Sequence, residues 1–396
     1  MPQVTIPYRV DAALERGIKG HGISREHALC LIEEGPLDPL LDAAAAVRDR
    51  CKGGSVSFSK KVFIPLTHLC RDYCGYCTFR ADPQPGVQAY MLPDEVLALA
   101  EAGRNAGCKE ALFSLGDQPE RLFPEAKQFL KRLGFDRTLE YLAAMSELVL
   151  EQTGLLPHSN PGVMGADDLR RLRETNVSVG LMIESASTRL GRPGEAHWKA
   201  PDKVPALRIR TIEAAGKLSM AFTTGILIGI GETLEERVDA LLAIRSAHEK
   251  YGHIQEVIVQ PFRAKPDIRM ALEPEPCTAD LERTIAVARL VLGGTMNIQS
   301  PPNLLLQDYP DLLKAGINDW GGISPVTKDF INPEAAWPQI SLLAARSAGA
   351  GFVLRERLAI YPEFASRPEF VNARLQPHVR KLQAEDGYAR KECETW

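Results

Sequence analysis

The sequence predicts an α/β protein whose main domain is a (βα) barrel of the TIM type. After residue 53 the chain repeats one unit, which is a short apolar run, a polar loop and an amphipathic helical stretch. The runs VGLMIE and GILIGI are apolar at almost every position, which is typical of parallel strands covered on both faces. An open doubly wound sheet is the main alternative, but no Gly-x-Gly-x-x-Gly turn follows the first run. The sequence leaves open whether the barrel has eight strands or is a partial barrel of six strands with extensions.

The elements are expected in the following order. Residues 1–60 are predicted to form a helical preface, because apolar residues recur at helical spacing in 24–33 and 37–50. The barrel is predicted over 61–350, and 351–396 as a C-terminal extension. The predicted strands are 62–67, 110–115, 155–160, 177–184, 221–228, 254–260, 295–299 and 316–320. The predicted helices between them include 93–106, 138–152, 203–217, 234–250 and 278–292.

Composition excludes several classes of function. The chain has 396 residues, 45% hydrophobic and 25% charged, with a formal net charge of -4, so it offers no basic field for nucleic acid or an anionic membrane. No basic segment followed by an apolar run begins the chain, and no apolar run is long enough to span a bilayer. Eight irregularly spaced cysteines do not make a disulfide framework. We therefore expect a cytoplasmic protein that acts on small molecules.

The segment Cys70-x3-Cys74-x2-Cys77 follows the first predicted strand and contains three thiolates that can hold one metal centre. A structural zinc site needs four ligands, usually from two pairs, and the chain has no second Cys-x-x-Cys. A 4Fe-4S cluster held by three cysteines leaves one iron open to chelate a small molecule such as S-adenosylmethionine (SAM). This spacing, with Tyr76 before the last cysteine, resembles the signature of the radical SAM superfamily.

Polar or glycine-rich residues also follow the other predicted strands, and in a barrel these positions meet on one rim. They comprise Gly116, Asp117, Gln118 and Glu120 after the second strand, His158 and Asn160 on the third, Glu184 on the fourth, Gly225, Gly229 and Glu232 on and after the fifth, and Arg263 after the sixth. We expect them to build a single site with the three cysteines.

Each of these segments also has a purely structural explanation. Residues 116–120 suit an ordinary turn, Glu184 suits a rim salt bridge, and residues 225–232 suit a strand and turn. The superfamily resemblance implies SAM-binding roles instead: the amino group for 116–120, the ribose for Glu184 and the adenine for 225–232. His68 is predicted to order the cysteine loop and not to bind iron.

Seven phrases carry a closer resemblance: VFIPLTHLCRDYCGYCTFR, SLGDQPE, LPHSNPGVM, GEAHWKAPDKVP, TTGILIGIGET, HIQEVIVQPFRAKP and NDWGGISPVT. Together they resemble the 7,8-didemethyl-8-hydroxy-5-deazariboflavin synthase family, the first radical SAM component of FO synthase. Enzymes of that family close the 5-amino-5-(4-hydroxybenzyl)-6-(ribitylimino)-dihydrouracil adduct to the deazaflavin FO with loss of ammonia, as carbon-nitrogen lyases. The resemblance implies that Cys70, Cys74 and Cys77 hold the cluster, that SAM binds the open iron, and that an external donor supplies the electron.

The substrate residues are not implied by the resemblance. A ribityl chain and a uracil-like ring need hydrogen-bonding partners, and the candidates are His158, Asn160, His197, Lys199, Arg263 and Asp319. Of these, His197 is the first choice for proton transfer, with His158 second, because loss of ammonia moves protons near neutral pH.

Two other functions remain open from the sequence. One is the sister reaction, in which a partner-type radical SAM enzyme joins tyrosine to 5-amino-6-ribitylaminouracil. The other is a non-enzymatic iron-sulfur protein. Because the chain has one cysteine triad and one predicted barrel, a companion FO synthase component is expected to supply the adduct.

Overall fold

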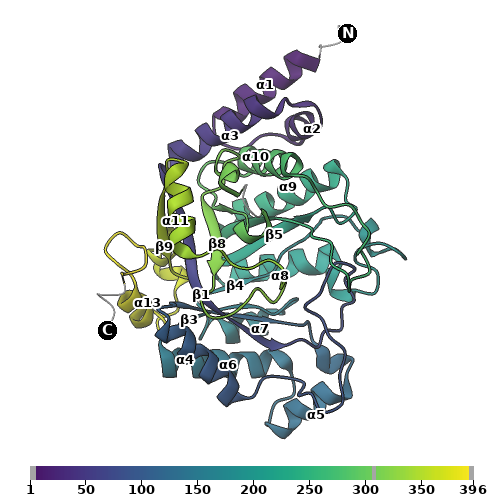
Figure 1. Cartoon of the computed structure of the whole chain (residues 1–396), viewed down its shortest axis with the longest axis vertical. Coiled ribbons are helices and arrows are strands. Elements are labelled where there is room, and N and C mark those ends of the chain that lie inside the picture. Colours follow the sequence, from purple (N-terminus) through teal and green to yellow (C-terminus); the bar gives the residue numbers. More distant parts are fainter. Residues whose placement is uncertain (1–5, 306–308, 392–396) are drawn as a thin grey trace.

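Eight parallel strands close into a barrel in a computed structural model that describes residues 6–305 and 309–391. The strands pair in chain order from β2 to β8, and β1 closes the ring by pairing with both β8 and β2 (Figure 1). They are β1 (Ser55–Thr67), β2 (Glu110–Leu115), β3 (Leu156–Asn160), β4 (Ser178–Gly180), β5 (Phe222–Ile228), β6 (Ile254–Pro261), β7 (Ile298–Gln299) and β8 (Asp319–Ile323). The predicted barrel is confirmed, and the closed ring decides for eight strands.

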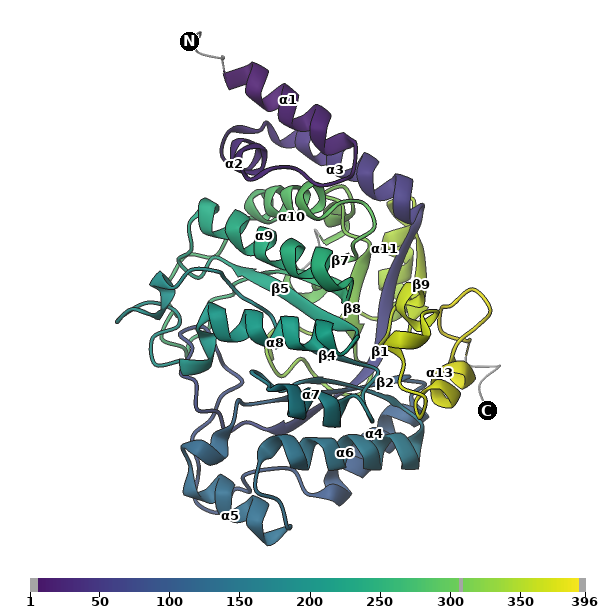
Figure 2. The ribbon, with the colours of Figure 1, turned by 180° about the vertical axis from the view of Figure 1, so that it is seen from behind.

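The predicted helices are present between the strands. The helices are α1 (Ile6–Ile18), α2 (Arg25–Glu34), α3 (Leu37–Lys52), α4 (Pro93–Asn105), α5 (Pro124–Arg132), α6 (Thr138–Thr153), α7 (Ala166–Leu172), α8 (Pro205–Lys217), α9 (Leu234–Tyr251), α10 (Thr278–Leu292), α11 (Ile340–Gly349), α12 (Pro362–Ala365) and α13 (Gln376–Leu382). Helices α1 to α3 lie together beyond α9 and α10 at one end of the molecule (Figures 1 and 2). Among the described residues, no helix is both long and apolar enough to cross a membrane.

Local sequence explains where several helices begin. Helix α9 starts with a capping box, in which the Thr233 hydroxyl accepts from the Glu236 N–H at 3.1 Å and Glu236 accepts from the Thr233 N–H at 2.9 Å. Ser24 caps α2 through the N–H of His27. These contacts satisfy backbone donors that a helix start otherwise leaves unpaired.

Four strands differ clearly from their predicted limits, and β1 does so by beginning at Ser55 in place of residue 62. Strand β4 ends at Gly180 although the apolar run continues, and Glu184 has a left-handed φ of 63° with one isolated bridge to Ile226. Strands β7 and β8 begin three residues later than expected, and Gly316 turns the chain with a φ of 102° before β8. Apolarity alone does not mark these ends, because Leu181 and Ile183 beyond β4 are buried although the regular ladder has stopped.

The C-terminal segment covers the end of the barrel where the strands begin. Strand β9 (Val353–Arg357) pairs with the first half of β1, which starts at Ser55 and so crosses the predicted boundary at residue 60. Apolar side chains after β9, among them Ile360 and Phe364, pack with Leu156 and Ala221 at the starts of β3 and β5. The barrel is therefore closed at its amino end and accessible from the carboxyl end.

Arg289 joins α10 to the loops before β7 and β8. It is fully buried, and its guanidinium donates to the carbonyls of Met296 (2.6 Å) and Gly316 (2.9 Å) and to Oδ1 of Asn318 (2.8 Å). Replacing it removes these donors and leaves buried acceptors without partners.

We predict that Arg289→Met lowers the free energy of unfolding by about 3 kcal/mol, from the usual cost of unpaired buried groups. Thermal unfolding followed by calorimetry measures the change. The exposed Arg170→Met is the control and should shift the midpoint little. An unchanged midpoint for Arg289→Met would show that these bonds do not stabilise the barrel.

Candidate functional site

The three predicted metal ligands line one end of a cavity of about 370 Å³ inside the barrel. Their loop is held by neighbouring loops: the Gly75 N–H donates to the carbonyl of Ala196 at 2.7 Å, and the Tyr73 N–H to that of Lys199 at 3.0 Å. As predicted, His68 orders the loop, because its Nδ1 lies 2.9 Å from the Phe79 carbonyl and its ring packs on Phe79. The cysteines are thus positioned by contacts distant in sequence.

The sulfur atoms have an environment suited to an iron-sulfur cluster. Cys70 Sγ accepts from the backbone N–H groups of Asp117 (3.2 Å) and Asp72 (3.4 Å). Burial raises the pKa of the Cys70 thiol to about 12 and also raises that of Cys74. A bound metal would hold these buried sulfurs as thiolates. Among the described residues, no fourth cysteine lines the cavity, so the donor set fits a 4Fe-4S cluster with one open iron.

Three buried carboxylates lie beside the cysteine loop, and sequence reasoning found only one of them. Oxygen atoms of Asp72, Asp117 and Asp202 lie within 4.8 Å of one another. Arg71 binds both oxygens of Asp202, and Asp72 accepts from the Asp202 N–H at 3.1 Å. Asp117 accepts from a backbone N–H through Oδ2, but Oδ1 is buried without a partner. Burial and the charges of Asp202 and Asp72 raise the pKa of Asp117 to about 7. A cationic group placed there would relieve this repulsion.

Glu184 lies on the cavity wall in an ion pair. Its carboxylate contacts Lys203 Nζ at 2.5 Å and lies 3.9 Å from Nη2 of Arg208. Burial alone would raise the pKa of Glu184, but the charges of Lys203 and Arg208 outweigh it and hold the pKa below its usual value. The salt-bridge alternative is thus realised, yet the carboxylate remains at the cavity. Lys203, just before α8, and Arg208, on α8, were missed because nothing in the sequence distinguishes them from surface basic residues.

Some residues of the segment after β2 line the cavity, and others form contacts within the protein. Gly116 and Asp117 line the cavity, and a Cβ atom on Gly116 would overlap the carbonyl oxygen of Leu69. Gln118 and Glu120 do not line it. Glu120 accepts from the N–H (3.2 Å) and hydroxyl (2.5 Å) of Thr138 at the start of α6. The structure therefore gives Glu120 a helix-capping role, in place of the predicted contact with SAM.

The glycine-rich segment after β5 is also explained by the chain itself. Gly225 and Gly229 do not line the cavity, and a Cβ on either would overlap neighbouring atoms, the carbonyl oxygen of Ile258 for the first. Glu232 accepts from the Gly229 N–H at 2.8 Å and from Arg237 Nε at 2.7 Å, which closes the turn. Leu227, between the glycines, lines the cavity instead.

His197 and Lys199 lie outside the lining of the large cavity. Both line a second cavity, of about 280 Å³. His197 Nε2 lies 3.2 Å from the hydroxyl of Tyr76, whereas its Nδ1 is buried without a partner. Burial and the charges of Lys203 and Arg208 lower the pKa of His197 to about 3. His197 is thus a neutral imidazole behind Tyr76, and its predicted contact with substrate has no direct support from its position.

Of the remaining predicted substrate residues, some line the large cavity and one does not. His158 and Asn160 line the large cavity, with His158 Nε2 at 3.0 Å from Asn160 Oδ1, and burial lowers the pKa of His158. Arg263 lines the cavity but pairs with Glu275 at 2.7 Å. Asp319 does not line it, because its carboxylate is fully buried against Arg357, at 2.7 and 3.0 Å. Asp319 therefore has a structural role in place of the predicted one.

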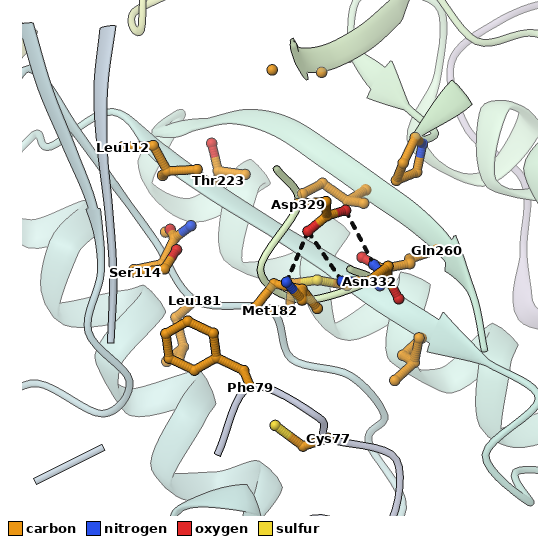
Figure 3. A pocket seen from close by; sticks show the side chains of 18 of the residues that line it. Cys77, Phe79, Leu112, Ser114, Leu181, Met182, Thr223, Gln260, Asp329 and Asn332 are labelled. Carbon is orange, nitrogen blue, oxygen red and sulfur yellow. Dashed lines mark hydrogen bonds between the residues drawn. The ribbon is translucent and has the colours of Figure 1, made fainter. Parts of the chain in front are cut away.

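The far end of the cavity is polar, and sequence reasoning missed it. Its lining residues there are Lys61, Glu110, Thr223, Glu256, Gln299 and Arg357. Figure 3 shows Cys77 at one end of the cavity and Leu112 and Thr223 at the other. The available signal was a single charged residue within an apolar strand, as with Glu256 in IQEVIVQ.

Comparison with known proteins agrees with this geometry. Residues 64–244 match the family model of the radical SAM superfamily. The FO synthase of Streptomyces avermitilis is 49% identical over 93% of this chain, which spans 44% of that protein's length. The 7,8-didemethyl-8-hydroxy-5-deazariboflavin synthase of Methanopyrus kandleri is 49% identical over 85% of this chain and 100% of its own length. The solved structure of HydG, a maturase of the FeFe hydrogenase, shares the fold with a TM-score of 0.74 over 90% of this chain and 78% of its own, at 14% identity.

We predict that anaerobically reconstituted protein binds about four irons per chain. The variant Cys74→Ala should bind almost none, because two thiolates do not retain the cluster. The control is Cys277→Ala, whose thiol is exposed and outside both cavities, and its iron content should be unchanged. Iron and sulfide analysis makes the measurement. Full iron content in Cys74→Ala would contradict the assignment of ligands.

Proposed function

The chain belongs to the 7,8-didemethyl-8-hydroxy-5-deazariboflavin synthase family of the radical SAM superfamily, and from this premise we propose that it makes FO. The reaction is closure of the hydroxybenzyl ribityliminodihydrouracil adduct with loss of ammonia, which makes the enzyme a carbon-nitrogen lyase. The observation that carries the proposal is a cysteine triad at one end of a cavity inside the barrel whose far end is polar. The match to the whole length of the Methanopyrus kandleri synthase supports it.

The cofactor site is proposed from the groups around the cysteines. Cys70, Cys74 and Cys77 would hold the cluster, and the carboxylates of Asp72 and Asp117 suit the ammonium group of SAM. Lys203 and Arg208 suit its carboxylate. When bound, the cluster and SAM supply the radical that removes a hydrogen atom from the substrate. An external electron donor and a companion component that supplies the adduct are part of the proposal.

Loss of ammonia moves protons off the substrate and onto the departing nitrogen. His158 is the proposed acceptor of a substrate proton, because it lines the cavity and burial lowers its pKa, so that its imidazole is neutral near pH 7. Once protonated, it can pass that proton to the departing nitrogen. Its Nδ1 lies 2.6 Å from the Ser178 hydroxyl, which orients the ring. His197 would act only through Tyr76, and we propose it as a positioning residue for the cysteine loop.

We predict that reduced enzyme with SAM and the adduct forms FO, detected by deazaflavin fluorescence, with one ammonia released for each FO. Tyrosine and 5-amino-6-ribitylaminouracil should yield none without the companion component. Hydrogen transfer needs the reacting atoms held at about 3 to 3.5 Å, and a pocket shaped for the joined adduct does not fix two fragments equally well. FO formed from the free fragments would support the partner-type reaction instead, and SAM-independent chemistry would support neither.

A second prediction concerns Glu184. If its carboxylate binds the ribose hydroxyls of SAM, Glu184→Gln should weaken SAM affinity about ten-fold, because a neutral acceptor is weaker than a charged one. Equilibrium binding on the reconstituted protein measures this, and iron content should not change. Glu235→Gln, exposed on α9, is the matched control. Unchanged SAM affinity in Glu184→Gln would leave only the ion pair with Lys203 as its role.

A further inference from the structure

The interior of this barrel is not filled by apolar side chains, although layers of branched apolar residues are the usual filling of such barrels. The layer near the strand starts contains Lys61 on β1, Glu110 on β2, His158 on β3, Glu256 on β6 and Gln299 on β7. Strand pairing places Lys61 beside Glu110 and Glu256 beside Thr223 in this layer. We call these five residues the polar floor.

Glycines make room for the polar floor. A Cβ atom on Gly322 would lie 2.7 Å from Lys61 Nζ, and one on Gly321 would overlap the amide of Gln299. A Cβ on Gly180 would overlap Oδ1 of Asn160 and lie 3.1 Å from His158 Nε2. The chain therefore keeps space in the barrel for side chains that a purely structural core would not contain.

Two residues of the floor, Lys61 and Gln299, and the neighbouring Trp337 have polar groups that the protein does not satisfy. Lys61 is 8% exposed and, within the described residues, pairs with no carboxylate; its ammonium faces the rings of Trp337 (4.9 Å) and Phe63 (5.6 Å). Gln299 Oε1 and Trp337 Nε1 are buried without hydrogen-bond partners. An unpaired buried ammonium destabilises a fold. These groups are therefore arranged for a ligand with many hydrogen-bonding groups.

Between the floor and the cysteines the cavity has a mixed lining, in which apolar side chains lie near polar ones such as Ser114, Gln260 and Asp329 (Figure 3). Phe79 and Leu181 lie between Cys77 and the end formed by Leu112 and Thr223 (Figure 3). Phe63, Phe79 and Leu112 pack as one apolar cluster. The cavity therefore offers an apolar patch around Phe79 and Leu181 on the cysteine side and a charged layer at the floor.

We propose that the polar floor binds the ribitylated pyrimidinedione half of the adduct, with the hydroxybenzyl half against Phe79 and Leu181 on the cysteine side. This assignment rests on the proposed function. Lys61 and the Gln299 amide donate to carbonyl or hydroxyl oxygens, and Glu110 and Glu256 accept from ribityl hydroxyls. The reverse orientation would place the hydroxybenzyl ring against the floor and leave Lys61 and Gln299 Oε1 without partners, which is costly.

The orientation also decides which part of the adduct faces the cysteines. The carbon that joins the two halves would lie on the cysteine side of the floor, toward the residues that would hold the cluster and SAM. The polar half then serves as the anchor that holds this carbon in place.

The test uses Lys61→Met, which keeps the length of the side chain and removes its charge. The probe is 5-amino-6-ribitylaminouracil, titrated calorimetrically into the reconstituted protein. We expect affinity to fall about ten-fold or more, as for loss of a hydrogen bond to a charged group. The melting temperature should stay the same or rise, because an unpaired buried charge has been removed. Lys250→Met, on an exposed helix position, should change neither quantity.

Gln299→Leu provides a second variant, and it should weaken binding of the same probe. Neither variant should weaken binding of 4-methylphenol, which represents the hydroxybenzyl half.

A lower melting temperature with unchanged affinity in Lys61→Met would overturn the proposal in favour of a structural lysine. Failure of wild-type protein to bind the probe at millimolar concentration would also overturn it. FO formation by wild type with unchanged probe affinity in both variants would overturn the floor assignment alone. Probe binding without FO formation would overturn only the proposed reaction.

Discussion

Charged side chains enclosed within the barrel are the constraint on which the rest of this structure depends. Arg357 lies between Asp319 and Glu256, at 2.7 and 3.2 Å, and all three are buried. Buried charges are costly unless they are paired and hydrogen-bonded. The C-terminal segment supplies the pairing through Arg357 from β9, and it also covers the barrel end with apolar side chains.

The cysteine loop depends on contacts of the same long-range kind. Its backbone bonds to the loop after β4, and Met270 from the loop after β6 donates to the Gly75 carbonyl at 3.0 Å. Asp72 lies between Cys70 and Cys74 in the sequence, and its carboxylate accepts a hydrogen bond from the N–H of Asp202. Because three loops meet there, a change in any one of them is expected to affect the position of the sulfur atoms. The cluster motif therefore needs the whole barrel rim for its geometry.

Sequence reasoning succeeded where the signal is local. The apolar runs predicted the barrel strands, since strands covered on both faces must be apolar throughout, and the cysteine spacing predicted the metal ligands. Sequence reasoning predicted the roles of glycines and carboxylates less well, because these residues have several structural uses. Gly225 is explained by the approach of Ile258, and Glu120 by the start of α6, although both lie in segments that resemble SAM-binding motifs.

The sequence by itself determined the fold class, the cysteine triad and the family resemblance, because buried strands and ligand spacing can both be recognised within short continuous segments. Only the tertiary structure decided which polar residues face the cavity. Lys61, Glu256 and Gln299 are separated by up to 238 positions, and Arg357 comes from the extension. Their meeting depends on strand register and on the glycines opposite them, and His197 lies behind Tyr76 for the same reason. Register is a property of paired strands, so no single stretch of sequence contains it.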